Sequence, residues 1–277
     1  MNAKTRSRVL GWVVTLLTVA GAAFVLLPYF WMVSSSFKTQ DAIFRLPLEW
    51  MPREPRWQNY PSALGRFPFG VYFFNSTVMA LAVMAGNLFF GSLAAYGLAK
   101  FRFPLRELCF RAMLSTLMLP LEILLVPTFL VVRQLGLLDS YGGLIVPLAV
   151  DAFGIFLMRQ YITDLPDSLI EAARLDGCTE FGIYWRIVLP NCRPALAALA
   201  VLSFRENWDQ FLWPLVIISK EALKTFPLGL AQFEGFHSAS YHEMMAAAAV
   251  GMIPMILLFL LFQRAFVRGL TLTGLKE

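Results

Sequence analysis

The sequence predicts an all-helical integral membrane protein with six membrane-spanning helices. Of its 277 residues, 58% are hydrophobic and only 15% are charged, whereas soluble domains are about 45–50% apolar and about 25% charged. Phe alone accounts for 25 residues. A soluble chain of this length could not bury so much apolar surface, because large exposed apolar patches are rare on soluble monomers. Lipid is therefore expected to surround much of the chain.

Six stretches are long and apolar enough to cross a membrane, which takes about 20 residues. They are Val9–Val33, Phe69–Leu98, Leu108–Val132, Leu144–Gln160, Ala195–Ile218 and Met244–Val267. The first follows a basic start, as a signal peptide would. Its apolar run is longer than the roughly 7–15 residues of a signal-peptide core, and no A-x-A site closes it. We interpret it as an uncleaved first span.

The distribution of Lys and Arg predicts the orientation. With the N-terminus inside, the inner segments carry 14 of these residues and the outer loops carry 8. Since Lys and Arg are retained on the cytoplasmic side, both termini are expected in the cytoplasm. The net charge of +5 fits this distribution, and no segment resembles a solvated nucleic-acid-binding domain.

Several catalytic and cofactor motifs are missing from the sequence. No Gly-Lys pair occurs, so there is no Walker A phosphate loop, and neither GxG nor HExxH is present. Cys109, Cys178 and Cys192 form no CxxC pair, which excludes a CxxC zinc site. We therefore expect no catalytic residue, no metal site and no cofactor bound by this chain.

The segment from Asp164 to Pro194 contains several residues typical of helix starts and helix ends. Ser168 and Glu171 have capping-box spacing, and Glu171 could also pair with Arg174 at i,i+3. Gly177 stands where a helix ends in a left-handed residue, and Thr179 can cap a second helix. The pattern predicts a helix, a sharp bend and another short helix, all on the cytoplasmic side.

Local chemistry alone leaves two interpretations of this segment open. The bent pair could present Leu169, Ala172, Ala173 and Phe181 to another protein. Alternatively, both helices could lie on the bilayer surface with Tyr184 and Trp185 as anchors.

A resemblance favours the first interpretation. The sequence reads Glu171-Ala172-Ala173, three residues, Gly177, nine residues, Ile187, one residue, Leu189-Pro190. This resembles the EAA motif of the permease subunits of binding-protein-dependent ABC importers. Asp176 and Pro194 are similar to the carbohydrate-uptake branch, the maltose/glycerol-3-phosphate type. Residues 101–104, 119–120, 136–139, 207–215 and 262–270 resemble the same branch. Two departures, Glu122 in place of a neutral Gln and the tail 273–277, leave the solute open.

The resemblance implies the type I ABC importer permease fold, in a prokaryotic inner membrane. Its expected partners are a second and different permease chain, two ATPase subunits that hold ATP and Mg²⁺, and an extracytoplasmic solute-binding protein. The implied ATPase-coupling residues are Glu171, Ala172, Ala173, Asp176, Gly177, Ile187, Leu189 and Pro190. The expected parts are an N-terminal region over 1–68, a transmembrane domain over 69–267 with the coupling loop at 164–194, and a cytoplasmic tail over 268–277.

Polar groups inside predicted spans mark a candidate path for the solute, because ionisable residues are costly there. The candidates are Glu122, Asp151, Glu206, Asn207, Trp208, Asp209, Phe211 and Trp213. Aromatic rings beside carboxylates and amides suit a sugar. The same groups could instead bind the second permease or be solvated at a helix end, and Arg205 could neutralise Asp209 at i,i+4. The alternative function is an ion-coupled secondary transporter, although no inverted repeat is visible.

Overall fold

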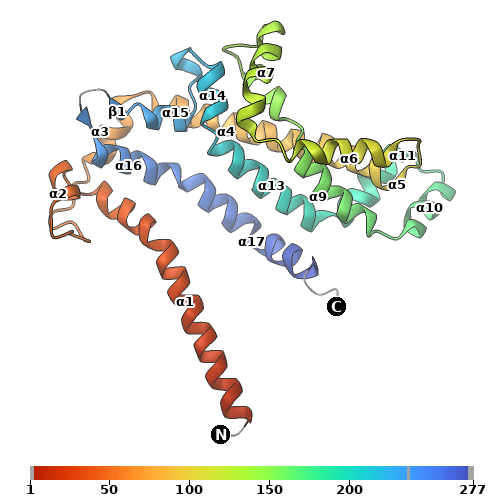
Figure 1. Cartoon of the computed structure of the whole chain (residues 1–277), viewed down its shortest axis with the longest axis horizontal. Helices are drawn as coiled ribbons and strands as arrows, with labels where there is room; N and C mark the ends of the chain where they lie inside the picture. Colours follow the sequence, from red (N-terminus) through yellow and green to blue (C-terminus); the bar gives the residue numbers. More distant parts are fainter. Residues whose placement is uncertain (1–2, 236–237, 274–277) are drawn as a thin grey trace. The chain divides into compact units, whose positions relative to one another are not determined.

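The computed structural model describes residues 3–235 and 238–273 and consists almost entirely of helices (Figure 1). The last four residues of the tail predicted over 268–277 lie outside the described residues. The chain divides into two units with separate internal packing. One contains residues 1–68 and 230–253, and the other contains residues 69–229 and 254–277.

The first unit is built around two helices. Helix α1 (Ala3–Ser36) packs against α16 (Tyr241–Gly251), which also contacts α3 (Asn59–Arg66) and α2 (Gln40–Phe44). Two short strands, β1 (Glu234–Gly235) and β2 (Ser238–Ala239), pair antiparallel. The described side chains of α1 from residue 11 to residue 30 are exposed throughout, so lipid or another chain must cover this apolar helix.

The second unit contains the remaining helices. In chain order they are α4 (Phe69–Gly86), α5 (Ser92–Lys100), α6 (Arg106–Thr116), α7 (Leu121–Gln134), α8 (Tyr141–Ile145), α9 (Ala152–Thr163), α10 (Asp167–Leu175), α11 (Glu180–Ile183), α12 (Leu189–Asn191), α13 (Arg193–Trp208), α14 (Leu212–Ile217), α15 (Phe226–Ala231) and α17 (Ile253–Thr273). One π-helical stretch, Asn87–Gly91, joins α4 to α5, and another, Tyr184–Val188, joins α11 to α12. Helix α15 crosses the boundary between the two units, and α17 begins at the last residue of the first unit.

Packing in this unit centres on α4 with α13 and on α5 with α9. A buried cluster that includes Tyr96, Met158 and Tyr184 joins α5, α9 and the 184–188 turn. The backbone at Gly86 lies very close to the backbone at Ala149. A Cβ atom on Gly86 would be 2.7 Å from the carbonyl oxygen of Ala149. Only glycine fits at this contact, since 2.7 Å is shorter than real Cβ contacts allow.

Helix length and composition support three of the six predicted spans as single helices. Gly11–Ser36, Phe69–Lys100 and Tyr241–Gln263 are each long and apolar enough to cross a membrane. Two bent pairs could serve as one span each: Tyr141–Leu148 with Ala152–Thr163, bent by 42°, and Glu180–Asn191 with Arg193–Trp208, bent by 82°.

Besides the bent span predicted over Leu144–Gln160, two further predicted spans are not continuous helices. The span predicted over Leu108–Val132 is divided into α6 and α7. Pro120 explains the break, because it lacks an N–H and disfavours a helical conformation at Leu119. The span predicted over Ala195–Ile218 is divided into α13 and α14, and Asp209 follows the last residue of α13.

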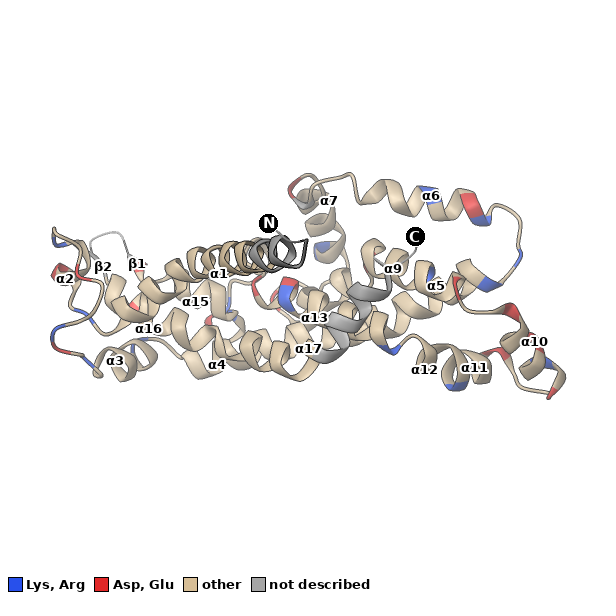
Figure 2. Ribbon diagram, turned by 90° about the horizontal axis from the view of Figure 1, so that it is seen from below, with Lys and Arg blue, Asp and Glu red and all other residues tan. Residues whose placement is uncertain are grey.

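Charge is unevenly distributed over the second unit. Figure 2 shows Lys, Arg, Asp and Glu on α6, α10 and the turn after α5, whereas α4 has none. An uncharged helix beside charged turns is the pattern expected where a span leaves the membrane. The turn after α5 and the segment that contains α10 are therefore the places to look for contacts outside the bilayer.

Candidate functional site

Residues 164–194, called here the EAA loop, begin with a helix whose end is built by the backbone. Helix α10 ends at Leu175, and Gly177 adopts a left-handed φ of 79°. The amide of Gly177 donates to the carbonyl of Arg174, and that of Cys178 donates to the carbonyl of Ala173, both at 3.0 Å. These two bonds form a Schellman motif. The bend predicted at Gly177 is confirmed.

The predicted helix cap is present on α11 but absent from α10. The Thr179 hydroxyl accepts from the amide of Gly182 at 3.2 Å, as predicted for the cap of α11. The predicted capping box of Ser168 and Glu171 is wrong. Helix α10 already begins at Asp167, with Pro166 before it and no side-chain cap, so Ser168 lies inside the first turn.

Glu180 is the polar centre of the bend. Its carboxylate accepts from Nε of Arg174 at 2.7 Å and from the hydroxyl of Tyr96 at 2.8 Å. Tyr96 lies on α5 and is 3% exposed. The predicted pairing of Arg174 with Glu171 is therefore replaced by a pair that closes the bend and ties it to α5. The sequence interpretation missed Glu180, although an acidic residue in the first turn of α11 was a signal.

Two further contacts hold the EAA loop to α5. The ammonium of Lys100 donates to the Leu165 carbonyl and to the Asp167 carboxylate, both at 2.6 Å. Lys100 holds the pKa of the Asp167 carboxyl below its usual range. The hydroxyls of Tyr184 and Ser92 lie 2.8 Å apart in the buried cluster. The loop is thus fixed to α5 at its start and at its second helix.

The EAA loop has one buried face and one exposed face. Ile170, Ala173, Ile183 and Tyr184 are buried, whereas Glu171 and Ala172 are exposed. The two adjacent alanines of the predicted coupling set therefore differ, since Ala173 packs against the protein and Ala172 faces outward. Large apolar side chains also lie exposed: Leu169, Leu175, Phe181 and Trp185.

The remaining predicted coupling residues lie at or near the second break of the loop. Asp176 and Gly177 are exposed at the bend, Ile187 and Leu189 are half-buried, and Pro190 is exposed. Pro190 follows the π-helical turn and cannot donate to the carbonyl four residues earlier. The helix that contains it ends at Asn191, and α13 begins two residues later at Arg193, after a bend of 82°.

The polar cluster around the end of α13 separates into buried and exposed groups. Trp208 stacks on Phe204 and Phe226, and the Trp213 indole donates to the Gly143 carbonyl at 3.0 Å. Both Trp side chains are 2% exposed. Asn207 is also buried, and its amide donates to the Ser203 carbonyl at 2.8 Å. These three predicted path residues therefore pack inside this chain.

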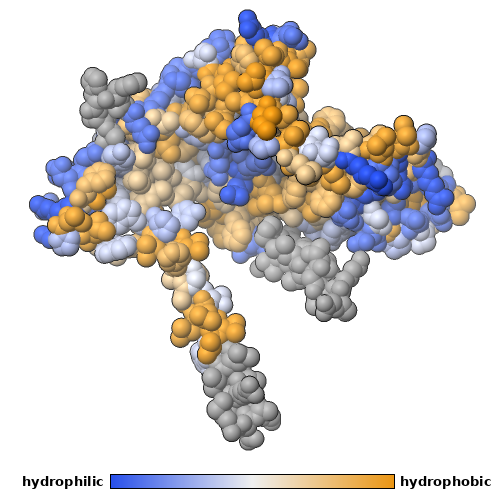
Figure 3. Space-filling view, viewed as in Figure 1, coloured by the Kyte–Doolittle hydropathy of each residue, from blue (hydrophilic) through white to orange (hydrophobic). Residues whose placement is uncertain are grey.

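The acidic members of the same cluster are exposed. Glu206 and Asp209 have exposed side chains, and Phe211 is half-buried. Within the described part of the chain, Arg205 is an electrostatic neighbour of Asp209 but forms no ion pair with it, so the predicted pairing is met only in part. Asp209 lies just beyond the end of α13. Figure 3 shows hydrophilic surface near this end of α13, bordered by apolar surface.

Two other predicted path residues lie at helix starts. Asp151 caps α9, and its carboxylate oxygens accept from the amides of Phe153 at 2.7 Å and Gly154 at 3.1 Å. It is also an electrostatic neighbour of Glu206. Glu122 lies exposed in the first turn of α7. Among residues 3–235 and 238–273, no three His, Cys, Asp or Glu side chains converge as a metal would require.

Comparisons with known proteins agree with these features. Residues 87–272 match the family model described as "Binding-protein-dependent transport system inner membrane component". The chain is 36% identical to the arabinooligosaccharides transport system permease protein AraQ of Bacillus subtilis (strain 168), covering 91% of this chain and 90% of that protein. It is 39% identical to the sn-glycerol-3-phosphate transport system permease protein UgpE of Pectobacterium atrosepticum, covering 91% and 92%.

A solved structure shares the fold. It is a bacterial ABC transporter involved in the import of the acidic polysaccharide alginate. One of its chains superposes with a TM-score of 0.84 at 24% identity, covering 96% of this chain and 99% of that one.

Proposed function

The chain belongs to the family of binding-protein-dependent transport system inner membrane components, and on that premise we propose that it is one of two permease subunits in an ATP-driven importer of a sugar or oligosaccharide. Its proposed partners are a second, different permease, two ATPase subunits and an extracytoplasmic binding protein. ATP and Mg²⁺ would bind to the ATPase subunits. Family membership favours this class over the ion-coupled secondary transporter.

The observation that carries the coupling proposal is the exposed face of the EAA loop. Glu171 and Ala172 lie exposed on α10, and Leu169, Leu175, Phe181 and Trp185 expose apolar surface around them. Small and apolar side chains allow close approach, and the Glu171 carboxylate offers a charge for a basic partner group. An ATPase subunit is the partner that a permease without its own nucleotide site requires.

We further propose how the movement travels. ATP binding closes the ATPase dimer and moves the EAA loop with it. The Schellman bend and the Arg174–Glu180–Tyr96 contacts make the loop stiff, so the motion passes to α5 and the helices packed on it. The permease then rocks between inward-facing and outward-facing states by rigid-body motion.

The membrane arrangement follows from the same proposal. The six proposed spans are the three long helices, the bent pair Tyr141–Leu148 with Ala152–Thr163, and the broken pairs α6–α7 and α13–α14, with both termini in the cytoplasm. In this arrangement, residues 1–68 form the N-terminal region, residues 69–267 form the transmembrane domain and residues 268–277 form the cytoplasmic tail. The same arrangement places the EAA loop on the ATPase side, together with the excess of Lys and Arg.

The charge near the end of α13 supports a neutral solute. Glu206 and Asp209 are exposed there and Asp151 is close to Glu206, with Arg205 as the cation of this group. Carboxylates accept hydrogen bonds from sugar hydroxyls but repel a phosphate. A neutral sugar or oligosaccharide is therefore favoured. The likeness to the sn-glycerol-3-phosphate permeases makes that solute the second candidate.

The coupling proposal is tested by replacing Glu171 with alanine in the complete importer. We expect less ATPase to copurify and binding-protein-stimulated ATP hydrolysis to fall about tenfold, since a charged pair across an interface is worth on the order of 1.4 kcal/mol or more. Glu54→Ala removes another exposed carboxylate, outside the loop, and should behave like wild type. Normal ATPase recovery and stimulation in Glu171→Ala would contradict the proposal.

The solute path is tested with Glu206→Gln and Asp209→Asn. Each is expected to lower the initial uptake of a neutral oligosaccharide about tenfold through a lost charge-assisted hydrogen bond, while ATPase copurification stays normal. Glu234→Gln, at an exposed carboxylate in the first unit, is the matched control. Uptake of sn-glycerol-3-phosphate, but not of the neutral oligosaccharide, by the wild-type importer would favour the second candidate. Unchanged uptake of both solutes would remove these residues from the path.

A further inference from the structure

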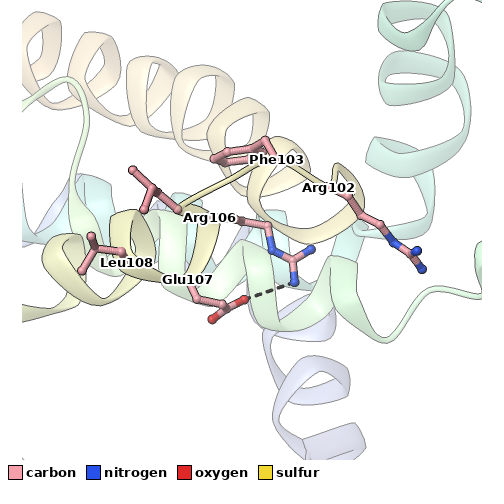
Figure 4. Close-up of a pocket in the computed structure, with 6 residues that line it drawn as sticks. Arg102, Phe103, Arg106, Glu107 and Leu108 are labelled. Atoms are coloured by element: carbon pink, nitrogen blue, oxygen red, sulfur yellow. Dashed lines mark hydrogen bonds and ion pairs between the residues drawn. The ribbon is translucent and has the colours of Figure 1, made fainter.

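The turn after α5 forms a basic surface pocket that the proposed function does not use. A pocket of about 410 Å³ is lined by Arg102, Phe103, Leu105, Arg106, Glu107 and Leu108. Figure 4 shows the Arg106 side chain reaching toward Glu107 and the Arg102 side chain extending outward from the turn. The pocket adjoins the end of Phe69–Lys100, a helix long and apolar enough to span a membrane. It therefore lies where a span meets the membrane surface.

The pocket has uncompensated positive charge. Arg102 is exposed and makes no hydrogen bond or ion pair with any described residue. Arg106 contacts Glu107 at 3.2 Å, but Glu107 also accepts from Arg159 at 2.8 Å. The single negative charge of Glu107 is thus shared between two guanidinium groups. Asp167 pairs with Lys100 nearby and is also an electrostatic neighbour of Arg102, so one carboxylate again faces more than one cation. The charge left over at the pocket is positive, which favours an anionic ligand.

The apolar lining points to a ligand that also has hydrocarbon. Phe103, Leu105 and Leu108 are 43%, 68% and 61% exposed. Leu105 also has a left-handed φ of 64°, which costs a non-glycine residue about 1–2 kcal/mol. The turn therefore holds a strained leucine with its side chain out of the protein core. Such a side chain gains free energy when acyl chains cover it.

The geometry points to a binding site for an anionic phospholipid, with Arg102 and Arg106 holding the phosphate and Phe103, Leu105 and Leu108 contacting the acyl chains. Basic pockets beside spans hold acidic lipid headgroups in the same way, and guanidinium groups suit phosphate geometry. The site requires only that the end of α5 lies at a membrane surface. The lipid site does not depend on which solute the importer carries.

An acidic segment of an ATPase subunit is the competing occupant. A neighbouring cavity of about 570 Å³ shares Arg102 and Arg106 and is also lined by Glu171. A lipid fits the pocket of Figure 4 better, because an acidic protein segment leaves the three exposed apolar side chains without a match. The experiment separates the two occupants.

The test uses the complete importer, purified from vesicles of phosphatidylglycerol and phosphatidylcholine, with retained lipid measured by native mass spectrometry. Arg102→Gln removes no hydrogen bond or ion pair within the described chain, so it should assemble normally. We expect it to retain about fivefold less phosphatidylglycerol, the effect of one cation at a membrane surface, with unchanged phosphatidylcholine. Arg111→Gln, an exposed arginine on α6 outside the pocket, is the matched control and should retain the wild-type amount.

Three results would overturn the inference. Equal phosphatidylglycerol retention in Arg102→Gln and wild type would remove the site. Loss of the ATPase subunits from Arg102→Gln with normal lipid retention would assign the pocket to the protein partner. Displacement of phosphatidylglycerol by millimolar inorganic phosphate would assign it to a free anion.

Discussion

Replacing Gly177 with valine is expected to lower binding-protein-stimulated ATP hydrolysis and solute uptake about tenfold or more. Gly177 has a φ of 79°, and no atom lies within 4 Å of the position that a Cβ would occupy. The cost of a side chain is therefore conformational and not steric. It is about 1–2 kcal/mol for an L-residue in the left-handed region, and more for a β-branched one. The valine variant is therefore expected to lose the sharp bend. The side chains on the exposed face of the EAA loop then no longer keep their relative positions.

The matched substitution at the same position is Gly177→Asn. Asparagine tolerates the left-handed region, so this variant should retain most of the coupled hydrolysis. Gly65→Val provides a second control, because Gly65 also has no atom near its Cβ position but does not have a positive φ. Both activities are measured in vesicles with purified binding protein. Equal activity of the valine and asparagine variants at position 177 would refute a role for the bend.

Replacing Glu180 with alanine is expected to uncouple transport from hydrolysis and to lower the thermal stability of the importer. The substitution leaves the buried Tyr96 hydroxyl without its acceptor, at a cost of about 1–3 kcal/mol. It also breaks the pair with Arg174. Both side chains of that pair are about two-fifths exposed, so this part contributes only about 0–1 kcal/mol. Arg174→Ala should therefore have a much smaller effect than Glu180→Ala.

A double-mutant cycle separates these contributions. Tyr96→Phe removes the hydroxyl, so adding Glu180→Ala to it no longer leaves a buried polar group without a partner. The double variant should be less damaged than the sum of the single variants, both in thermal stability and in coupled hydrolysis. Strict additivity would mean that Glu180 acts without Tyr96, and the proposed transmission to α5 would fail.

Features that depend on residues close together in the chain could be predicted without the fold. Hydrophobic length predicted the long helices that begin near Gly11 and Phe69. The bend at Gly177 and the cap at Thr179 were also predicted, because the bonds that make them span six residues or fewer. The family likewise followed from the spacing of the EAA motif and agrees with the match over residues 87–272.

Packing between distant segments sets which polar residues are exposed and which contacts stiffen the EAA loop. Asn207 and Trp208 are buried, whereas Glu206 beside them is exposed. The order of residues cannot make this distinction, since it depends on which face of α13 packs against α4. Similarly, Glu180 contacts Tyr96, which is 84 residues away along the chain. A hydrogen bond of that kind leaves no local pattern, because it exists only once α5 and the EAA loop have packed together.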